Sequence, residues 1–276
     1  MKAYHIIDTS PKTAFGERYE PKDYDVLCQV ISAKLWQKTN GKIGLFTDKN
    51  GLSALGGIAE IYDEVKTLPD IGEIDNIAFW AGGKIYALAE ISAPCAIIDT
   101  DFIVWDKLNF NDGITVAHRE VLNPFVYPDK SSFVITDGYE FNPNWDWSAL
   151  PCNTAFMYFD SDGFKNYYTR CSKEFMKASK NCDNVLTYMV FAEQRLLSMC
   201  ASEQGIPINA LMDYEKLGAD NRFTHLWGYK QVLQENKSER DAFCKRCAKR
   251  IINDFPECVN ILKNYEVTKL YFLGDD

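Results

Sequence analysis

The chain has 276 residues, of which 46% are hydrophobic and 25% charged, a composition typical of a globular protein with a sizeable core. Its formal net charge of −9 argues against a general nucleic-acid binder, because binding to the phosphate backbone depends on lysine and arginine. The N-terminus lacks a secretory leader and no apolar run reaches the ~18–20 residues of a membrane span, so we expect a cytoplasmic protein whose nine cysteines stay thiols.

Strands alternate with helices along the N-terminal part of the chain. This order predicts a mainly parallel sheet with helices on its faces. In such sheets the ligand binds beyond the carboxyl ends of the strands, where Asp48, Asp99 and Asp101 are expected to lie. The expected strands span residues 3–8, 41–48 and 95–101, and the expected helices span 23–39, 51–61 and 79–92.

The middle of the chain, residues 106–150, is rich in turn residues and aromatic side chains and predicts hairpins and loops near a binding surface. Beyond it we expect one more strand, two helices, the second capped by Gly205, and a helical tail. We therefore expect one α/β domain over residues 1–232 and a C-terminal helical extension over 233–276 that packs on it. The later expected elements are a strand at 153–161 and helices at 162–179, 183–205 and 238–265.

Two aspartates, Asp99 and Asp101, follow the apolar run 96–98 with one residue between them. Carboxylates are almost never buried unless they are paired or bind a cation. Either the strand ends at Ile98 and presents both carboxylates at its tip, or a cation sits on them. Two hard oxygen ligands at this spacing suit Mn²⁺ or Mg²⁺, and the alternative is a pair of capping or turn aspartates.

Three further stretches follow this D-x-D in order: "CNTAFMYFDSDGF", "MVFAEQRLLSMC" and "THLWGYK". Together the four resemble the family 8 glycosyltransferases, which include the glycogenin-like and lipopolysaccharide galactosyltransferase-like enzymes. The resemblance extends over roughly residues 3–230 and lies in the motifs rather than in continuous sequence. The family's D-x-D, N-x-G, D-Q and H-x-x-G-Lys motifs correspond here to Asp99 and Asp101, Asn153, Glu193 with Gln194, and His225 with Gly228 and Lys230.

The chain departs from the family pattern at four points. Ala155 stands where the family has glycine, Glu193 replaces aspartate, Lys230 comes one residue early, and the Pro-Trp that often follows is absent. The resemblance implies a GT-A fold, a Rossmann-like, mixed and mainly parallel sheet with helices on both faces. It also implies retaining transfer of a sugar from a nucleotide-diphosphate donor, with UDP favoured, to a glycan or lipid-linked acceptor, as in an outlying bacterial branch serving surface-polysaccharide synthesis.

The resemblance implies that Asp99, Asp101 and His225 hold a divalent metal ion. Such an ion bridges the two phosphates of the donor and stabilises the charge of the departing diphosphate. Gly228 would let the backbone approach the phosphate, and Lys230 would add a positive charge beside it. A structural histidine and a solvated lysine are the alternatives at His225 and Lys230.

Two further residues are candidates for donor binding. Asp48 ends the second expected strand and could face the base or the ribose, although "DKNG" is also a turn signal. The resemblance places a basic residue near the nucleotide on the helix before the D-x-D, which makes Lys84 a candidate, with an exposed surface lysine as the alternative.

Acceptor binding and catalysis are expected at Asn153 and at Glu193 or Gln194. Asn153 lies at a strand tip and could hydrogen-bond the acceptor sugar, or it could be a strand-edge residue. Adjacent residues of a helix point ~100° apart, so only one of Glu193 and Gln194 is expected to face the site. The amide is a debated nucleophile in the family, whereas a carboxylate is the better nucleophile chemically.

Two other functions stay open. "IIDTDFIV" superficially resembles the motif of haloacid dehalogenase-type phosphohydrolases, in which Asp99 would be the nucleophile and Asp101 the acid/base. That family has threonine or valine where this chain has Ile103, and it places the motif on its first strand. The other alternative is a protein that binds a nucleotide sugar without turnover.

Two features are expected to be structural, and the role of a third is open. Cys244 and Cys247 have the spacing of zinc ligands, but no second pair completes a site. The basic run 237–250 is expected to be a solvated helix face, with contact to an anionic membrane surface as the alternative. Tyr139, Trp145 and Trp147 are either platforms on which an acceptor sugar stacks or core residues under a long loop.

Overall fold

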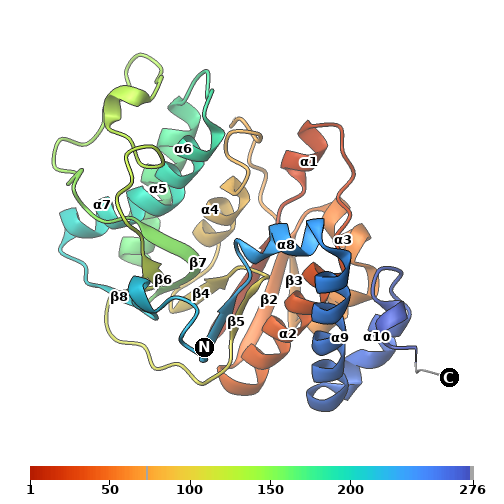
Figure 1. Cartoon of the computed structure of the whole chain (residues 1–276). Helices are drawn as coiled ribbons and strands as arrows, with labels where there is room; N and C mark the ends of the chain where they lie inside the picture. The colour runs from red at the N-terminus through yellow and green to blue at the C-terminus, as the bar shows by residue number, and fades with distance from the viewer. Residues whose placement is uncertain (73, 274–276) are drawn as a thin grey trace.

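The computed structural model, described here for residues 1–72 and 74–273, has a central seven-stranded sheet (Figure 1). The strand order is β3-β2-β1-β4-β7-β6-β8, and β7 is antiparallel to both of its neighbours while the other pairs are parallel. The expected α/β class with a mixed, mainly parallel sheet is therefore confirmed. The strands are β1 (Lys2–Ile7), β2 (Lys42–Thr47), β3 (Glu64–Thr67), β4 (Cys95–Ile98), β6 (Ile114–Arg119), β7 (Cys152–Phe159) and β8 (Ile208–Ala210).

Helices cover both faces of the sheet because successive side chains of a strand point to opposite faces. In β4, Ala96 and Ile98 belong to one apolar core, and Cys95 and Ile97 belong to the other. The first core contains α2 and α9, and the second contains α4, α5 and α7 (Figure 1). The helices of these two layers are α2 (Asp23–Thr39), α9 (Lys237–Asp254), α4 (Gly82–Ala89), α5 (Asp162–Ala178) and α7 (Leu196–Gln204).

Short helices connect the layers or extend the tail. The tail packs against the first core through α9. This helix ends just before Pro256, since proline cannot continue a helix. Gly205 ends α7 in the left-handed conformation, at φ 63°, as expected. The division of the chain at residue 232 stays a prediction. The remaining helices are α1 (Ser10–Ala14), α3 (Lys49–Leu55), α6 (Val185–Val190), α8 (Tyr229–Glu235) and α10 (Val259–Lys263).

A second, two-stranded sheet joins distant parts of the sequence. In it, β5 (Phe102–Val104) pairs antiparallel with β9 (Phe223–His225), and Phe102 lies opposite His225. The backbone N–H of Leu226 also donates to the carbonyl oxygen of Asp101 at 3.3 Å. This pairing brings the segment that carries His225 to the D-x-D turn.

The structure differs from the sequence expectation at several places, and the expected helix 238–265 is broken after Asp254 into α9 and α10. Strand β6, all but one of whose residues are buried, lies in the segment expected to hold loops and hairpins. The expected helix 183–205 is instead α6, a π-helical turn at Phe191–Arg195, and α7. Of the expected helix 79–92, only Gly82–Ala89 is helical and forms α4, and residues 77–81 before it are in turns.

The long segment before β7 is held down by a buried arginine. Arg195 is 3% exposed, and its guanidinium donates to the carbonyl oxygens of Tyr127, Pro128 and Trp147 at 2.5–2.6 Å. Trp145 is 6% exposed in the second core, and Tyr139 and Trp147 pack against it. Trp145 is therefore a core residue under a long loop, whereas for the partly buried Tyr139 and Trp147 a role as stacking platforms stays a prediction.

Within the described residues, none of the helices has both the length and the apolar character that crossing a membrane requires.

His5 in β1 is fully buried, with hydrogen bonds to the hydroxyls of Tyr62 at 2.8 Å and Ser32 at 3.1 Å. Burial lowers the pKa of His5 from 6.5 to about 3. Between pH 6.5 and about pH 3 the unfolded chain binds a proton at His5 and the folded chain does not. The free energy of unfolding therefore falls as the pH drops. Between about pH 7 and about pH 5.5 we expect His5 to account for a loss of about 1 kcal/mol.

Urea denaturation at the two pH values measures this loss. The variant His5→Gln has no titrating group at this position, so its stability should depend less on pH by the same about 1 kcal/mol. An unchanged pH dependence in His5→Gln would contradict the assignment.

Candidate functional site

The D-x-D forms a tight turn at the carboxyl end of β4. The backbone N–H of Asp99 donates to the carbonyl oxygen of Ala155 in β7 at 2.8 Å, and that of Phe102 donates to the carbonyl oxygen of Asp99 at 2.9 Å. β4 ends at Ile98, which is one of the two alternatives that the sequence leaves open and is shorter than the expected strand over 95–101, and β5 starts at Phe102. Asp101 is 7% exposed and Asp99 is half-buried, so both carboxylates face into the molecule.

Asp99, Asp101 and His225 come together as a group that fits a metal ion. One ligand atom from each lies within 4.8 Å of the others, and Nε2 of His225 is 3.9 Å from Oδ2 of Asp101. Two ligands of one divalent ion at ~2.1 Å can be about that far apart. Burial lowers the pKa of His225, which favours the neutral imidazole that binds metals. Among the described residues this is the one group of three such side chains that could hold an ion.

Lys84 links two carboxylates in the interior. Its Nζ atom is 2.7 Å from Oδ1 of Asp99 and 2.7 Å from Oε1 of Glu193, and it also donates to the carbonyl oxygen of Thr154 at 3.3 Å. Burial alone would lower the pKa of Lys84, but the two carboxylates offset it and raise the pKa overall. Burial raises the pKa of Glu193, and the charge of Lys84 opposes that rise. Lys84 is therefore a buried counter-ion and not an exposed surface lysine.

The first turn of α8 adds a second lysine. Nζ of Lys230 lies 3.0 Å from Oδ2 of Asp101 and 3.8 Å from Oδ1 of Asp25. Gly228 precedes α8 at φ −64°, and a Cβ there would meet no atom within 4 Å. The local structure therefore does not require glycine at this position, and an approach of its backbone to a phosphate stays a prediction.

A cavity of about 640 Å³ lies over these groups, within the range of small-molecule sites. Its lining includes the charged side chains of Lys84, Asp99, Asp101 and Lys230 and apolar side chains such as that of Trp80.

Asp8 also lines this cavity, although it belongs to none of the sequence motifs. Its Oδ1 accepts hydrogen bonds from the backbone N–H and the hydroxyl of Ser10 at 2.9 and 2.6 Å. A Cβ at Gly83 would lie 2.5 Å from Oδ2 of Asp8, so only glycine at position 83 leaves room for this carboxylate. Burial raises the pKa of Asp8. The available signal was its position directly after β1, which matches that of Asp99 after β4.

Three other predicted site residues are bound to the protein itself. Asp48 accepts from the backbone N–H and hydroxyl of Thr9 and from the backbone N–H of Gly51, so it caps α3 and ties β1 to β2. It lines a neighbouring cavity at this edge of the sheet.

Asn153 and Gln194 point toward the long loop. The Asn153 amide donates to Glu120 at 2.9 Å, and Oε1 of Gln194 accepts from the Tyr127 hydroxyl at 2.5 Å. Of the adjacent pair, Glu193 is thus the one directed at Lys84 and Asp99.

Cys244 and Cys247 are both buried in α9, and Cys28 of α2 lies beside Cys247. They belong to the packing between these two helices.

Comparisons with known proteins give similar structures but no sequence relative. No family model matches the chain, and no curated protein matches it by sequence. The PaToxG glycosyltransferase structure is 11% identical, with a TM-score of 0.43 over 89% of this chain and 77% of that one. The galactosyltransferase LgtC, in a complex with donor and acceptor sugar analogues, is 9% identical, with a TM-score of 0.36 over 76% and 73%. An active-site mutant of LgtC is 11% identical, also at 0.36, over 76% and 72%.

Removing the Lys84 charge should destabilise the protein strongly. In Lys84→Met, Glu193 stays buried without its counter-ion, and breaking a buried pair in this way costs about 3–5 kcal/mol. In the double variant Lys84→Met/Glu193→Gln the uncompensated charge is gone, so most of the loss should be recovered. Urea denaturation at neutral pH measures both values.

The matched control is Lys249→Met, because Lys249 is exposed on α9. It should change the free energy of unfolding by no more than about 0.5 kcal/mol. A double variant as unstable as Lys84→Met would show that the Glu193 charge is not the source of the loss.

Proposed function

We propose that this protein is a metal-dependent glycosyltransferase that moves a sugar from a nucleotide-diphosphate donor, with UDP favoured, to a glycan or related acceptor. The observation that carries the proposal is the meeting of Asp99 and Asp101 with His225 at the wall of an open cavity. The solved structures named above carry no weight at their TM-scores, and the proposal rests on this site.

The donor set fits a hard divalent cation such as Mn²⁺ or Mg²⁺, because it consists of two carboxylates and one neutral imidazole. When bound, such an ion supplies positive charge to the diphosphate leaving group. Asp99, Asp101 and His225 would hold it. Lys230, which is 3.0 Å from Asp101, would add a second positive charge on the same side of the cavity.

If transfer proceeds with retention, Glu193 is the candidate nucleophile of the adjacent pair, because it is directed at Lys84 and Asp99 whereas Gln194 is not. It is 3% exposed, and burial raises its pKa while the positive charge of Lys84 opposes that rise and favours the carboxylate. A carboxylate is a competent nucleophile toward an anomeric carbon, and its ion pair with Lys84 would hold its orientation. Gln194 is bonded to Tyr127 instead, which supports Glu193 as the catalytic residue and Gln194 as a residue that positions the loop.

Two further predictions concern a membrane, and the geometry of the site does not bear on them. An acceptor attached to a lipid and a contact of α9 with the inner face of a membrane both remain predictions. Several charges of α9 are already paired within the chain: Lys237 with Asp241, and Arg240 with Asp23. This pairing reduces the charge that α9 could offer to an anionic surface.

The phosphohydrolase alternative gives His225 no role. In that reaction Asp99 would be the nucleophile and Asp101 the acid/base, and neither needs an imidazole. The β5–β9 pairing that places His225 beside Asp101 therefore favours the metal site over the phosphatase. A protein that binds the donor without turnover would share this geometry.

A thermal-shift panel of nucleoside diphosphates and UDP-sugars, with Mn²⁺, Mg²⁺ or EDTA, tests the proposal. A ligand that binds only the folded state adds about 2.7 kcal/mol at 100 times its Kd, which is a readily visible shift. We expect the shift with UDP and Mn²⁺, and we expect EDTA, Asp101→Ala and His225→Ala to remove it.

The matched control is Asp106→Ala, since Asp106 is an exposed carboxylate just beyond β5 and should leave the shift unchanged. No shift with any nucleotide, or formation of a beryllium fluoride adduct with Mg²⁺ that ignores His225→Ala, would contradict the transferase. Slow release of sugar from the bound donor separates an enzyme from an inactive binding protein.

A further inference from the structure

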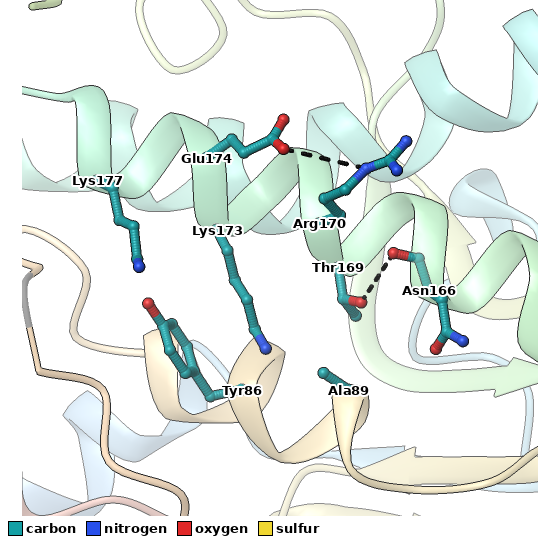
Figure 2. Close-up of a pocket in the computed structure, with 8 residues that line it drawn as sticks. All are labelled: Tyr86, Ala89, Asn166, Thr169, Arg170, Lys173, Glu174 and Lys177. Atoms are coloured by element: carbon teal, nitrogen blue, oxygen red, sulfur yellow. Dashed lines mark hydrogen bonds and ion pairs between the residues drawn. The ribbon is translucent and has the colours of Figure 1, made fainter.

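A second cavity, of about 520 Å³, lies between α4 and α5. It shares no lining residue with the cavity over Asp99 and Asp101, and its volume is within the range of small-ligand sites. Figure 2 shows its lining residues: Tyr86 and Ala89 from α4, and Asn166, Thr169, Arg170, Lys173, Glu174 and Lys177 from α5.

The lining is positively charged in a protein whose formal net charge is −9. Arg170, Lys173 and Lys177 follow helical spacing, which places them along one face of α5. Among the described residues Glu174 is the single carboxylate in the lining, and its Oε1 lies 4.0 Å from Nε of Arg170. Figure 2 shows this pair at the outer side of α5, while Lys173 and Lys177 extend toward α4.

Lys173 is the most confined of these cations. Its Nζ lies 4.6 Å from the centre of the Tyr86 ring, and Tyr86 is 8% exposed. Burial lowers the pKa of Lys173, the charges of Lys177 and Lys165 lower it further, and Glu90 raises it. Figure 2 shows the side chains of Lys173 and Lys177 both extending from α5 toward Tyr86, so two ammonium groups line one cleft.

We propose that the cleft between α4 and α5 binds a phosphate monoester, with Lys173 and Lys177 as its cationic contacts. A dianion between the two lysines relieves their mutual repulsion and forms charge-assisted hydrogen bonds with both. From α4, the Tyr86 ring lines one part of the cleft, and the small side chain of Ala89 leaves space beside it. The ligand is either a soluble phosphate ester or a phosphate-bearing lipid headgroup. This site is independent of the proposed glycosyltransferase function.

The two sources are separated with probes that share one headgroup. Glycerol 3-phosphate represents the soluble ester, and phosphatidylcholine vesicles with and without phosphatidic acid represent the lipid. Amide resonances of segment 166–177 are followed by NMR in EDTA during titration with glycerol 3-phosphate, and vesicle binding is measured by sedimentation. We expect a saturable response to one of them that weakens at higher salt.

The double variant Lys173→Ala/Lys177→Ala should weaken that binding by about tenfold or more, since it removes both charged contacts. Lys245→Ala/Lys249→Ala is the matched control, because it removes a pair of exposed lysines with the same spacing on α9. The control should stay within about twofold of the parent. If Lys173→Ala/Lys177→Ala does not fold, Lys173→Gln and the charge-conserving Lys173→Arg/Lys177→Arg replace it. Lys173→Gln should then lose binding, and Lys173→Arg/Lys177→Arg should keep it.

Binding of glycerol 3-phosphate assigns a soluble ligand, and binding of phosphatidic acid vesicles alone assigns a lipid. Three results would overturn the proposal: no saturable binding of either probe, equal weakening in both double variants, or shifts that fall at Asp99 to Asp101 instead of in segment 166–177.

Discussion

The candidate site depends on one buried ammonium group. Lys84 comes from α4, Asp99 from the end of β4 and Glu193 from the π-helical turn, and the Lys84 Nζ atom contacts both carboxylates at 2.7 Å. Two carboxylates this close in a low-dielectric interior would otherwise repel each other and one would take up a proton. The lysine therefore fixes three elements on the same side of the sheet and keeps the charges on which the site's chemistry depends.

The π-helical turn explains how Glu193 reaches that lysine. A regular helix over residues 185–204 would rotate its side chains evenly, whereas the wider turn at Phe191–Arg195 changes the rotation between α6 and α7. Side chains of α5 hold the turn: the Tyr168 hydroxyl donates to the carbonyl oxygen of Glu193 at 2.6 Å, and that of Ser172 to Ala192 at 2.7 Å. The same turn directs Arg195 to the carbonyls of the long loop, so one local irregularity positions both the site and the segment beside it.

Much of the fold follows from patterns that are local in sequence. Apolar periods predict β1, β2, β4, β7 and the long helices, and strand-end aspartates predict the edge at which the site forms. The strand β6 was missed because its apolar residues lie in a segment full of turn residues, and only pairing with β7 and β8 decides its conformation.

The site was predictable to the extent that its residues lie in short motifs. Asp99, Asp101 and His225 converge as the motifs imply, yet the contact depends on the β5–β9 register, which no local pattern encodes. The use of Asp48 as a helix cap and of Lys84 as a double counter-ion depends on neighbours distant in sequence. Asp8 was overlooked because a single aspartate after a strand has many ordinary roles.

The short helix α4 stands between the candidate site and the positively charged cleft. Lys84 faces the candidate site, and Tyr86, two residues later and therefore about 200° around the helix, faces the cleft with α5. Six of the eight residues of α4 are buried, so the helix is held by packing on the sheet rather than by solvent-exposed contacts. Helix α5 also contributes to both places, because Lys173 lines the cleft and Tyr168 holds the π-helical turn that carries Glu193. The packing of α4 on α5 thus fixes the distance between Lys84 and Glu193, and the cleft lies on the outer side of that packing.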